Sequence, residues 1–589
     1  MAPRVAILSL HSHADRSFLD DRELALVSGD LRRAGVDNEL VVAHVPDDAA
    51  SVPAELVALL APFDTLIYER VWSRELIEAL RRALPGRRLI ACEGEHALLA
   101  PPADVICRGD LRRTVPAVLA WLDGSRAAPP GTRERVDGAW REVRPTAEPS
   151  DEPLPWEPNL APRFSDGEAA ERYAAQPVSV IGNPGCPFQA DARANPLYEG
   201  ARLPDGMGRG CAFCTTGNRY EPSPPDATRE RVLERIRYVR AHGARDRIVL
   251  KDQNPFAWLG ELVARIGEER LGPLTLMLET RVDWFVRNAR RFERALEQAE
   301  AAEVTIAPYL IGIESFSQAE LDRFNKGVDA EDNIRFLDHL DEWAAKHPRT
   351  LDLSHAAFGF VLFTPWTTLA DLRINHRAIQ RTRFDRFRGS LLLSRARLYP
   401  DTALYYLAER DGLLCDAWPH EGADNAARYG YFPGHPWRFA DPVVERLSAL
   451  AATLSVRSDH RDQVGTLGRL LDAFERGVEP TIAEIERASP RSASPELEER
   501  LARLLRPIEL EAPFEGEWAV AGFAARPNRM RLRIARRNEA FFVDLVPRSS
   551  APAYARTRHY DVRYVGGRLA PERERALRTL ARALVRNDG

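Results

Sequence analysis

Two periods of hydrophobic positions alternate along the first 124 residues. Short apolar runs predict strands, and between them apolar residues recur at the spacing of an amphipathic helix. The predicted strands are Val5–Leu10, Glu39–His44, Thr65–Tyr68, Arg88–Cys92 and Asp104–Cys107, and the predicted helices are Asp20–Ala34, Ala54–Leu60, Arg74–Leu84 and Leu111–Leu122. Such alternation predicts a doubly wound α/β domain with a parallel sheet, whose ligands lie beyond the carboxyl ends of the strands.

Residues 125–178 break this pattern, because proline is frequent and no period is visible, so we expect a linker there. The alternation resumes over residues 179–415 and predicts a full or partial β/α barrel of the TIM type, with its chemistry at the carboxyl ends of the strands. The predicted strands are Ser179–Ile181, Ile248–Leu250, Leu274–Leu278, Val304–Ile313, Ala357–Phe363 and Leu391–Leu393.

The last third of the chain predicts two further regions. Residues 416–505 have a helical period after an aromatic cluster that includes Trp437 and Phe439. Residues 506–589 predict a small antiparallel β unit, because Met530, Leu532 and Ile534 alternate with arginines. A helix at Glu572–Arg586 is expected to close that unit.

Charge and hydropathy exclude several function classes. The 589 residues include 82 basic and 87 acidic side chains, a net charge of −5, which gives no general basic surface for nucleic acid. No stretch approaches the roughly 18–20 apolar residues of a membrane-spanning helix, and the N-terminal apolar run is too short for a secretory signal. We therefore expect a cytoplasmic protein without a membrane partner. Only three residues are lysines, namely Lys251, Lys326 and Lys346, and the first two are expected to be structural or solvated.

Three of the six cysteines, Cys186, Cys211 and Cys214, lie in a region rich in glycine and proline. Six cysteines in a chain of this length do not make a disulfide scaffold. The Cys-x-x-Cys pair is compatible with a zinc site or a redox dithiol, but a zinc site needs further close ligands and the region does not resemble a thioredoxin-like unit. Three thiolates can instead hold three irons of a [4Fe–4S] cluster.

The cysteine loop resembles that of radical S-adenosylmethionine (radical SAM) enzymes, in the subgroup with an N-terminal cobalamin-binding domain. Gly185-Cys-Pro-Phe188 matches the first half of the family's Cys-x3-Cys-x2-Cys loop, and Cys211-Ala-Phe-Cys214 matches the second half. About twenty additional residues separate the halves, and Met207 stands where the usual first cysteine would be. The resemblance implies three cluster ligands, Cys186, Cys211 and Cys214, with Cys186 reached by folding back the inserted loop.

Later segments resemble the strand ends of the same family in the same order. They are Arg247–Asp252, Glu279–Asp283, Ile311–Gln318, Leu321–Gly327, Gly359–Thr367 and Leu398–Tyr405. The resemblance places Phe213 near the adenine of S-adenosylmethionine, Glu314 and Ser315 near its ribose or methionine part, and Arg281 at its carboxylate.

The N-terminal domain resembles a flavodoxin-like cobalamin domain less closely. Cys92-Glu93-Gly94-Glu95-His96 is similar to a Gly-Gly-x-His element of such domains, so Glu93, Gly94 and His96 are candidate cobalamin contacts. Glu93 replaces the first glycine of that element, and the usual histidine loop that supplies a cobalt ligand is absent.

The family resemblance implies reductive cleavage of S-adenosylmethionine to a 5′-deoxyadenosyl radical. A cobalamin-dependent methyl transfer to an unactivated carbon or phosphorus centre is the leading expectation. The alternatives are cobalamin-free oxidation, rearrangement or group transfer, and a degenerate barrel that binds without a cluster. The expected partners are a small-molecule or peptide substrate and an electron donor such as flavodoxin or ferredoxin.

Overall fold

The structure is a computed structural model that forms two compact units, residues 1–179, 234–247 and 419–433, and residues 180–233, 248–418 and 434–589. It describes residues 4–12, 22–45, 52–69, 74–93, 103–108, 132–136, 139–142, 156–183, 185–214, 223–243, 245–252, 254–387, 391–392, 394–399, 402–415, 435, 437–457, 463–480, 508–510, 516–526, 529–536, 539–547 and 560–565.

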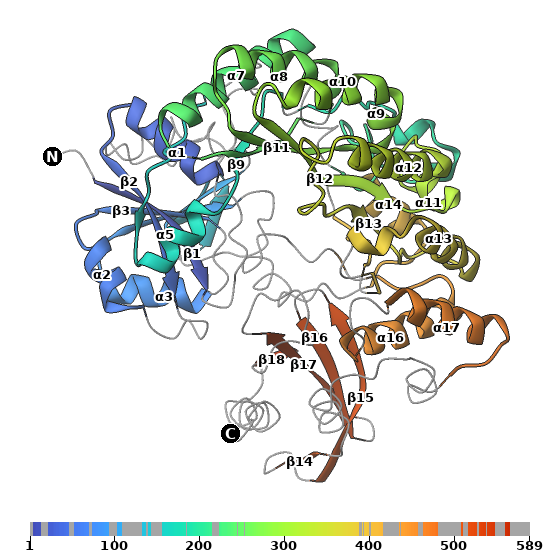
Figure 1. Ribbon diagram of the computed structural model, residues 1–589. Helices are drawn as coiled ribbons and strands as arrows, with labels where there is room; N and C mark the ends of the chain where they lie inside the picture. Colours follow the sequence, from blue (N-terminus) through green and yellow to red (C-terminus); the bar gives the residue numbers. More distant parts are fainter. Residues whose placement is uncertain are drawn as a thin grey trace. The chain divides into compact units, whose positions relative to one another are not determined.

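The first unit contains a sheet whose central strands run parallel (Figure 1). Their spatial order is β5-β4-β3-β1-β2, which is the order of flavodoxin-like sheets. The prediction of a doubly wound sheet is therefore confirmed for this part of the chain. The five strands are β1 (Val5–Ser12), β2 (Asn38–Val45), β3 (Thr65–Glu69), β4 (Arg88–Glu93) and β5 (Val105–Arg108).

Both faces of this sheet are covered by helices. Because successive strand side chains point to opposite faces, Val5 and Ile7 pack with α1 (Arg22–Arg33), whereas Ala6 and Leu8 pack with the two helices on the other face. Those two helices are α2 (Ala54–Leu60) and α3 (Arg74–Ala83). The predicted helix Leu111–Leu122 lies outside the described residues.

The segment expected to be a linker is partly built into the first unit. Two strands, β6 (Thr132–Val136) and β7 (Ala139–Glu142), extend the sheet beyond β5 in antiparallel pairing, and β8 (Arg163–Phe164) pairs in parallel with β2. The helix α5 (Gly167–Ala174) follows, with Asp166 as its N-cap. The predicted linker thus contains strands that its sequence did not reveal, because pairing with an existing sheet edge does not require a hydrophobic period.

The second unit contains a five-stranded sheet in the sequential order β9-β10-β11-β12-β13. Parallel pairing is present between β11 and β12 and between β12 and β13. This order agrees with a partial β/α barrel, and helices alternate with the strands along the chain (Figure 1). The strands are β9 (Val178–Val180), β10 (Arg247–Leu250), β11 (Leu274–Arg281), β12 (Val304–Glu314) and β13 (Gly359–Phe360).

Aromatic side chains of α9 (Val282–Arg287), α10 (Ala289–Ala299) and the 3-10 turn before α8 (Leu259–Glu268) pack together in this unit. Phe285 lies within 5.0 Å, between ring centroids, of both Phe256 and Phe292. Helix α7 (Pro225–Ala241) is divided between the two units. The other helices are α11 (Gln318–Arg323), α12 (Ala330–Lys346), α13 (Leu369–Thr382), α14 (Ala403–Arg410), α16 (Pro442–Arg457) and α17 (Gln463–Glu475).

The predicted antiparallel β unit near the C-terminus is confirmed. Its strands are neighbours in chain order, β14-β15-β16-β17-β18, and all pairs are antiparallel. They are β14 (Ile508–Leu510), β15 (Gly516–Arg526), β16 (Arg529–Arg536), β17 (Glu539–Pro547) and β18 (Tyr560–Val565). The predicted closing helix Glu572–Arg586 lies outside the described residues.

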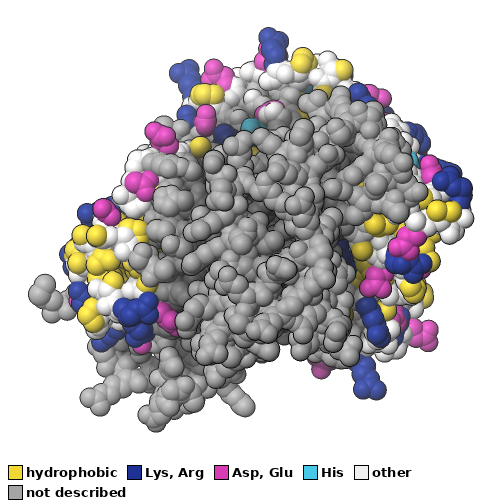
Figure 2. Space-filling model, turned by 90° about the horizontal axis from the view of Figure 1, so that it is seen from below, with side chains coloured by type: hydrophobic (Ala, Val, Ile, Leu, Met, Phe, Trp, Pro, Cys, Tyr) yellow, Lys and Arg dark blue, Asp and Glu magenta, His cyan; other side chains and the backbone are white. Residues whose placement is uncertain are grey.

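The surface and the helices give two further observations. Figure 2 shows basic and acidic side chains interspersed over the described part of one face, with no large area of a single charge there. Among the described helices, none is long and apolar enough to cross a bilayer.

Candidate functional site

Side chains predicted to carry the chemistry gather where three strands of the second unit end. Lys251 directly follows β10, Arg281 is the last residue of β11, and Glu314 is the last residue of β12. The parallel register places Arg281 opposite Gly312, two residues before Glu314. The sequence prediction that scattered strand ends meet at one edge is therefore confirmed for these residues.

One face of this sheet changes from apolar to charged toward that edge. Val249, Met277 and Ala307 form a buried apolar cluster on three neighbouring strands. Two residues further along β10 and β11, on the same face, Lys251 Nζ forms a 2.5 Å ion pair with Glu279 Oε1. The Lys251–Glu279 ion pair thus lies next to the buried apolar cluster, on the side of the carboxyl edge.

Asp252 holds the beginning of the cysteine loop. Its two carboxylate oxygens accept hydrogen bonds from the backbone N–H groups of Gly182 (2.8 Å) and Asn183 (2.6 Å). The Asn183 side chain in turn accepts from the Gly185 N–H at 3.0 Å. The carboxylate is buried, so these contacts fix the backbone that leads to Cys186.

The residues inserted between Cys186 and Cys211 fold back and dock on the end of α11. The Tyr198 hydroxyl donates to the Arg323 carbonyl at 2.7 Å, and Ala192 and Tyr198 are buried in one apolar cluster with Phe324. The Asn325 amide donates to the carbonyls of Ala190 (3.1 Å) and Gly210 (2.9 Å), which closes the inserted loop at its base. The insertion is a packed element of the unit.

The second half of the cysteine loop is fixed by backbone hydrogen bonds on both sides. The Ala212 N–H donates to the Phe324 carbonyl at 2.7 Å, and the Leu404 N–H donates to the Ala212 carbonyl at 2.8 Å. The Phe213 ring is half-buried and lies edge-on to Phe324, with centroids 5.3 Å apart. The two halves of the loop are thus held against the same part of the barrel.

The three candidate cysteines influence one another electrostatically. The pKa of Cys211 is raised to about 11, chiefly by burial; Lys326 and Arg281 oppose this rise, and the nearby charges of Cys214 and Cys186 add to it. Burial likewise raises the pKa of Cys186, and the charge of Cys214 adds to this effect. All three are free cysteines, and two cations stand beside them.

Arg281 is held by protein acceptors on each of its nitrogen atoms. Its Nε donates to Asp283 Oδ1 at 2.9 Å, one Nη donates to the Cys211 sulfur at 2.9 Å, and the other donates to the Lys326 carbonyl. The guanidinium also lies 3.9 Å from the centroid of the Phe188 ring. The side chain is 4% exposed, so a ligand carboxylate would have to displace one of these contacts. These contacts favour a positioning role over the carboxylate-binding role that the resemblance implied.

Lys326 and Glu314 form a buried ion pair beside the cysteines. Lys326 Nζ lies 3.0 Å from Glu314 Oε1 and 5.6 Å from the Phe213 ring centroid. Glu314 has a φ of +61°, a left-handed conformation that is unusual for a residue with a side chain and is typical of functional sites. A Cβ at Gly312 would lie 2.4 Å from Glu314 Oε1 and 2.6 Å from Lys326 Nζ, so glycine makes room for the pair.

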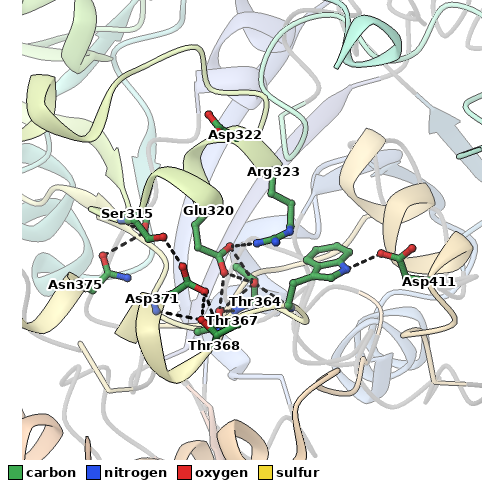
Figure 3. Close-up of polar contacts among 12 residues, drawn as sticks. Ser315, Glu320, Asp322, Arg323, Thr364, Thr367, Thr368, Asp371, Asn375 and Asp411 are labelled. Carbon is green, nitrogen blue, oxygen red and sulfur yellow. Dashed lines mark hydrogen bonds and ion pairs between the residues drawn. The ribbon is translucent and has the colours of Figure 1, made fainter. Parts of the chain in front are cut away.

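Ser315 belongs to a buried polar network that supports the end of β12 (Figure 3). Its hydroxyl lies 3.2 Å from the Asn375 Oδ1, and the same Asn375 oxygen accepts from the Phe316 N–H at 2.6 Å. Ser315 is fully buried, so its hydroxyl serves the protein interior. In the same network the Glu320 carboxylate accepts from the hydroxyls of Thr364 and Thr367, and burial raises its pKa.

Of the three cobalamin candidates in the first unit, one lies within the described residues. Glu93 is the last residue of β4, at the carboxyl end of the sheet. Gly94 and His96 lie outside the described residues. Their predicted contacts remain predictions.

Sequence reasoning did not assign Lys326 to the site, although it is one of only three lysines. That rarity was the one signal that could have pointed to it. Phe188, which stacks on Arg281, was visible only as part of the Cys-Pro-Phe motif. Within the described residues, no three His, Cys, Asp or Glu side chains lie close enough together to hold a single metal ion.

Comparisons with known proteins give the class of fold. No family model and no curated protein sequence matches the chain. A structure of the cobalamin-dependent S-adenosylmethionine radical enzyme OxsB, with aqua-cobalamin and S-adenosylmethionine bound, matches with a TM-score of 0.53 and 14% identity, over 81% of this chain and 71% of that one. The chain therefore has the fold of cobalamin-dependent radical SAM enzymes.

A second solved structure extends this comparison. The radical S-adenosylmethionine methyltransferase TsrM from Kitasatospora setae, with a tryptophan substrate and a SAM analogue bound, matches with a TM-score of 0.50 and 13% identity. The match covers 84% of this chain and 94% of that one. The resemblance read from the sequence motifs is thus confirmed at the level of the fold.

Proposed function

We propose that the chain is a radical SAM enzyme whose [4Fe–4S] cluster is held by Cys186, Cys211 and Cys214. The observation that carries this proposal is the convergence of three free thiols beside two buried cations, although Cys186 stands 25 residues before Cys211. The fold supports it independently. When bound, the cluster supplies the electron that breaks a carbon–sulfur bond of S-adenosylmethionine.

The donor set fits an iron–sulfur cluster. Cysteine thiolates are the usual ligands of such clusters, and each thiolate binds a different iron, so the sulfurs stand farther apart than around one metal ion. Arg281 and Lys326 provide positive charge that offsets the negative charge of the thiolates.

The residues around the cysteines would position the loop and exclude water. Arg281 fixes the Cys211 sulfur, Asp252 fixes the backbone before Cys186, and Phe213 presents a half-buried ring suited to contact the adenine. Glu314 would approach the ribose or methionine part of S-adenosylmethionine, with Lys326 holding its carboxylate in place. Ser315 would act through the backbone that its hydroxyl supports.

The leading reaction is methyl transfer to an unactivated carbon or phosphorus centre, with cobalamin bound by the first unit near Glu93, Gly94 and His96. The flavodoxin-like strand order and the fold of cobalamin-dependent enzymes favour this reaction. The substitution of Glu93 for the usual glycine favours the second candidate, a cobalamin-free radical SAM oxidation, rearrangement or group transfer. An electron donor such as flavodoxin or ferredoxin would serve either reaction.

Anaerobic reconstitution with iron and sulfide, followed by reductant and S-adenosylmethionine, tests the proposal. The expected product is 5′-deoxyadenosine, measured by liquid chromatography and mass spectrometry. Incubation with cobalamin and removal of the unbound fraction should leave a cobalamin absorption spectrum on the protein. A cluster without any cleavage of S-adenosylmethionine would refute the enzyme, and cleavage without bound cobalamin would select the cobalamin-free candidate.

A further inference from the structure

Arg395 extends the candidate site by two strand positions beyond Glu314. The Val361 N–H donates to the Glu314 carbonyl at 2.8 Å, and the chain at Phe363 forms a parallel bridge with Arg395. Neighbouring strands are about 4.8 Å apart and strands rise about 3.3 Å per residue. Glu314 pairs with Phe360 and Arg395 with Phe363, so the Arg395 backbone lies about 10 Å from that of Glu314 across the strands and about 10 Å further along them. Arg395 therefore stands at the same carboxyl edge as the cysteine site.

Two aromatic rings hold the Arg395 guanidinium. Its central carbon lies 4.3 Å from the centroid of Trp437 and 5.1 Å from that of Phe439. The Trp437 indole N–H donates to the Ala396 carbonyl at 3.0 Å, which fixes the ring. Trp437 packs against the apolar cluster that Phe213 also contacts, so the stacked arginine and the cysteine loop share one supporting core.

The charge of Arg395 lacks an acidic partner, in contrast to comparable arginines. Four other arginines of the second unit stack on aromatic rings, and each forms an ion pair with a carboxylate: Arg281, Arg287, Arg323 and Arg386. In the described part of the chain, Arg395 forms no ion pair. Glu445 and Cys415 influence its pKa only electrostatically.

Arg395 is accessible to a ligand, although the aromatic residues beside it are buried. The residue is solvent-exposed in the structure, whereas Phe363 and Phe439 beside it are buried. Desolvation lowers the pKa of Arg395 to about 10, at which the guanidinium still carries its charge at neutral pH. The two rings hold one side of the guanidinium, and an anion that reached its open side would gain a two-pronged contact.

We propose that Arg395 anchors a carboxylate or phosphate group of the substrate, with Trp437 and Phe439 holding the guanidinium in place. The identification of the anion as part of a substrate rests on the proposed function. Binding of an anion at Arg395 does not itself require the cluster. Carboxylate and phosphate each present two oxygens that an arginine fork can bind in a bidentate manner. The substrate class is therefore anionic.

Arginine footprinting tests this directly. The full-length reconstituted protein is treated with phenylglyoxal, and the modification of individual arginines is followed by peptide mass spectrometry, alone and with inorganic phosphate, acetate or S-adenosylmethionine. We expect phosphate or acetate to slow the modification of Arg395 at least fivefold. The matched control is Arg386, which also stacks on a ring but is paired with Asp341, and its rate should not change.

Each outcome decides the inference. Protection by phosphate alone indicates a phosphorylated substrate, protection by acetate alone indicates a carboxylic acid, and protection by both supports a general anion site. Protection by neither, or only by S-adenosylmethionine, overturns the assignment to substrate. In Arg395→Gln protein the protecting anion should bind at least tenfold more weakly, measured by calorimetry, whereas Arg386→Gln should bind it as the parent does. Cleavage of S-adenosylmethionine in the same preparation separates a failure of this inference from a failure of the proposed function.

Discussion

Two arginines share the carboxylate of Asp283, and their replacement by methionine should have very different consequences. Arg281 is 4% exposed and lies 2.9 Å from Asp283 Oδ1, whereas Arg287 is 62% exposed and lies 3.8 Å from Oδ2. Both also stack on the Trp284 ring, at 6.0 Å and 5.7 Å. The pair Arg281→Met and Arg287→Met therefore compares a buried with an exposed ion pair at one carboxylate.

The burial of Asp283 sets the expected magnitude. This carboxylate is 1% exposed, so loss of Arg281 leaves a buried charge without its main partner, which costs about 3–5 kcal/mol. The same change also removes the contacts with the Cys211 sulfur and the Lys326 carbonyl. Loss of Arg287 removes an exposed ion pair, which is worth at most about 1 kcal/mol.

Hydrogen–deuterium exchange of the peptide that covers β11 and α9 measures this difference within one unit of the chain. A loss of 3–5 kcal/mol corresponds to an exchange rate about 100- to 4,000-fold faster, because each 1.4 kcal/mol is a factor of ten. Arg287→Met should change the rate less than about tenfold. Equal changes of the exchange rate in the two variants would refute the positioning role of Arg281 at the site.

Three further changes test the surroundings of the site. Gly327→Ala should destabilise the fold by more than the roughly 1–2 kcal/mol expected for alanine at a left-handed position, because its Cβ would lie 2.8 Å from the Phe188 ring. Gly477 also has a positive φ but has open space around it, so Gly477→Ala should cost only those roughly 1–2 kcal/mol. Asp252→Asn should lower the iron bound after reconstitution, because one charge-assisted contact to the loop before Cys186 is lost, at about 1.5–3 kcal/mol. Hydrogen bonding from Arg373 lowers the pKa of Glu475 in the folded protein. The pair therefore stabilises the fold above the unfolded pKa of roughly 4.3, and this stabilisation is lost as the pH falls through the lower folded pKa. Glu475→Gln should remove this acid dependence, which is worth under about 1 kcal/mol at this exposed position.

The results that contradict these expectations are distinct. Equal destabilisation by the two glycine substitutions in chemical denaturation would show that the Phe188 contact is not tight. Full iron content in Asp252→Asn protein would separate the loop anchor from cluster binding. An unchanged slope of stability against pH between about pH 3 and pH 5 in Glu475→Gln protein would place the acid dependence elsewhere.

The sequence predicted the strands β1 to β5 of the first sheet, β9 to β13 of the second, and the edge at which they present polar residues, because these depend on period and on parallel pairing. Arg281 and Glu314 were found for this reason. Their partners were not, since spacing along the chain does not specify which acceptor a guanidinium reaches. Arg281 was expected to face a ligand carboxylate, and the structure gives its nitrogens to Asp283, Cys211 and the Lys326 backbone. The described part of the predicted strand Leu391–Leu393 is not a strand in the structure.

Two other features depended on contacts that are distant in sequence. The hairpin of β6 and β7 within the expected linker follows from an available edge at β5, which proline content does not reveal. The inserted loop before Cys211 is ordered by Asn325 and by the end of α11, more than a hundred residues away. Gly94 and His96, which lie outside the described residues, stay predictions.

The iron content of single cysteine variants tests the central claim most directly. Anaerobically reconstituted parent protein and Cys415→Ala protein, whose free cysteine is not among the three candidate ligands, should each hold about four irons per chain. Cys186→Ala, Cys211→Ala and Cys214→Ala proteins should hold substantially less, and should lose the electron paramagnetic resonance signal of the reduced cluster. Full iron content and an unchanged signal in Cys186→Ala protein would contradict the three-cysteine site, and the same result in Cys211→Ala protein would refute the cluster assignment itself.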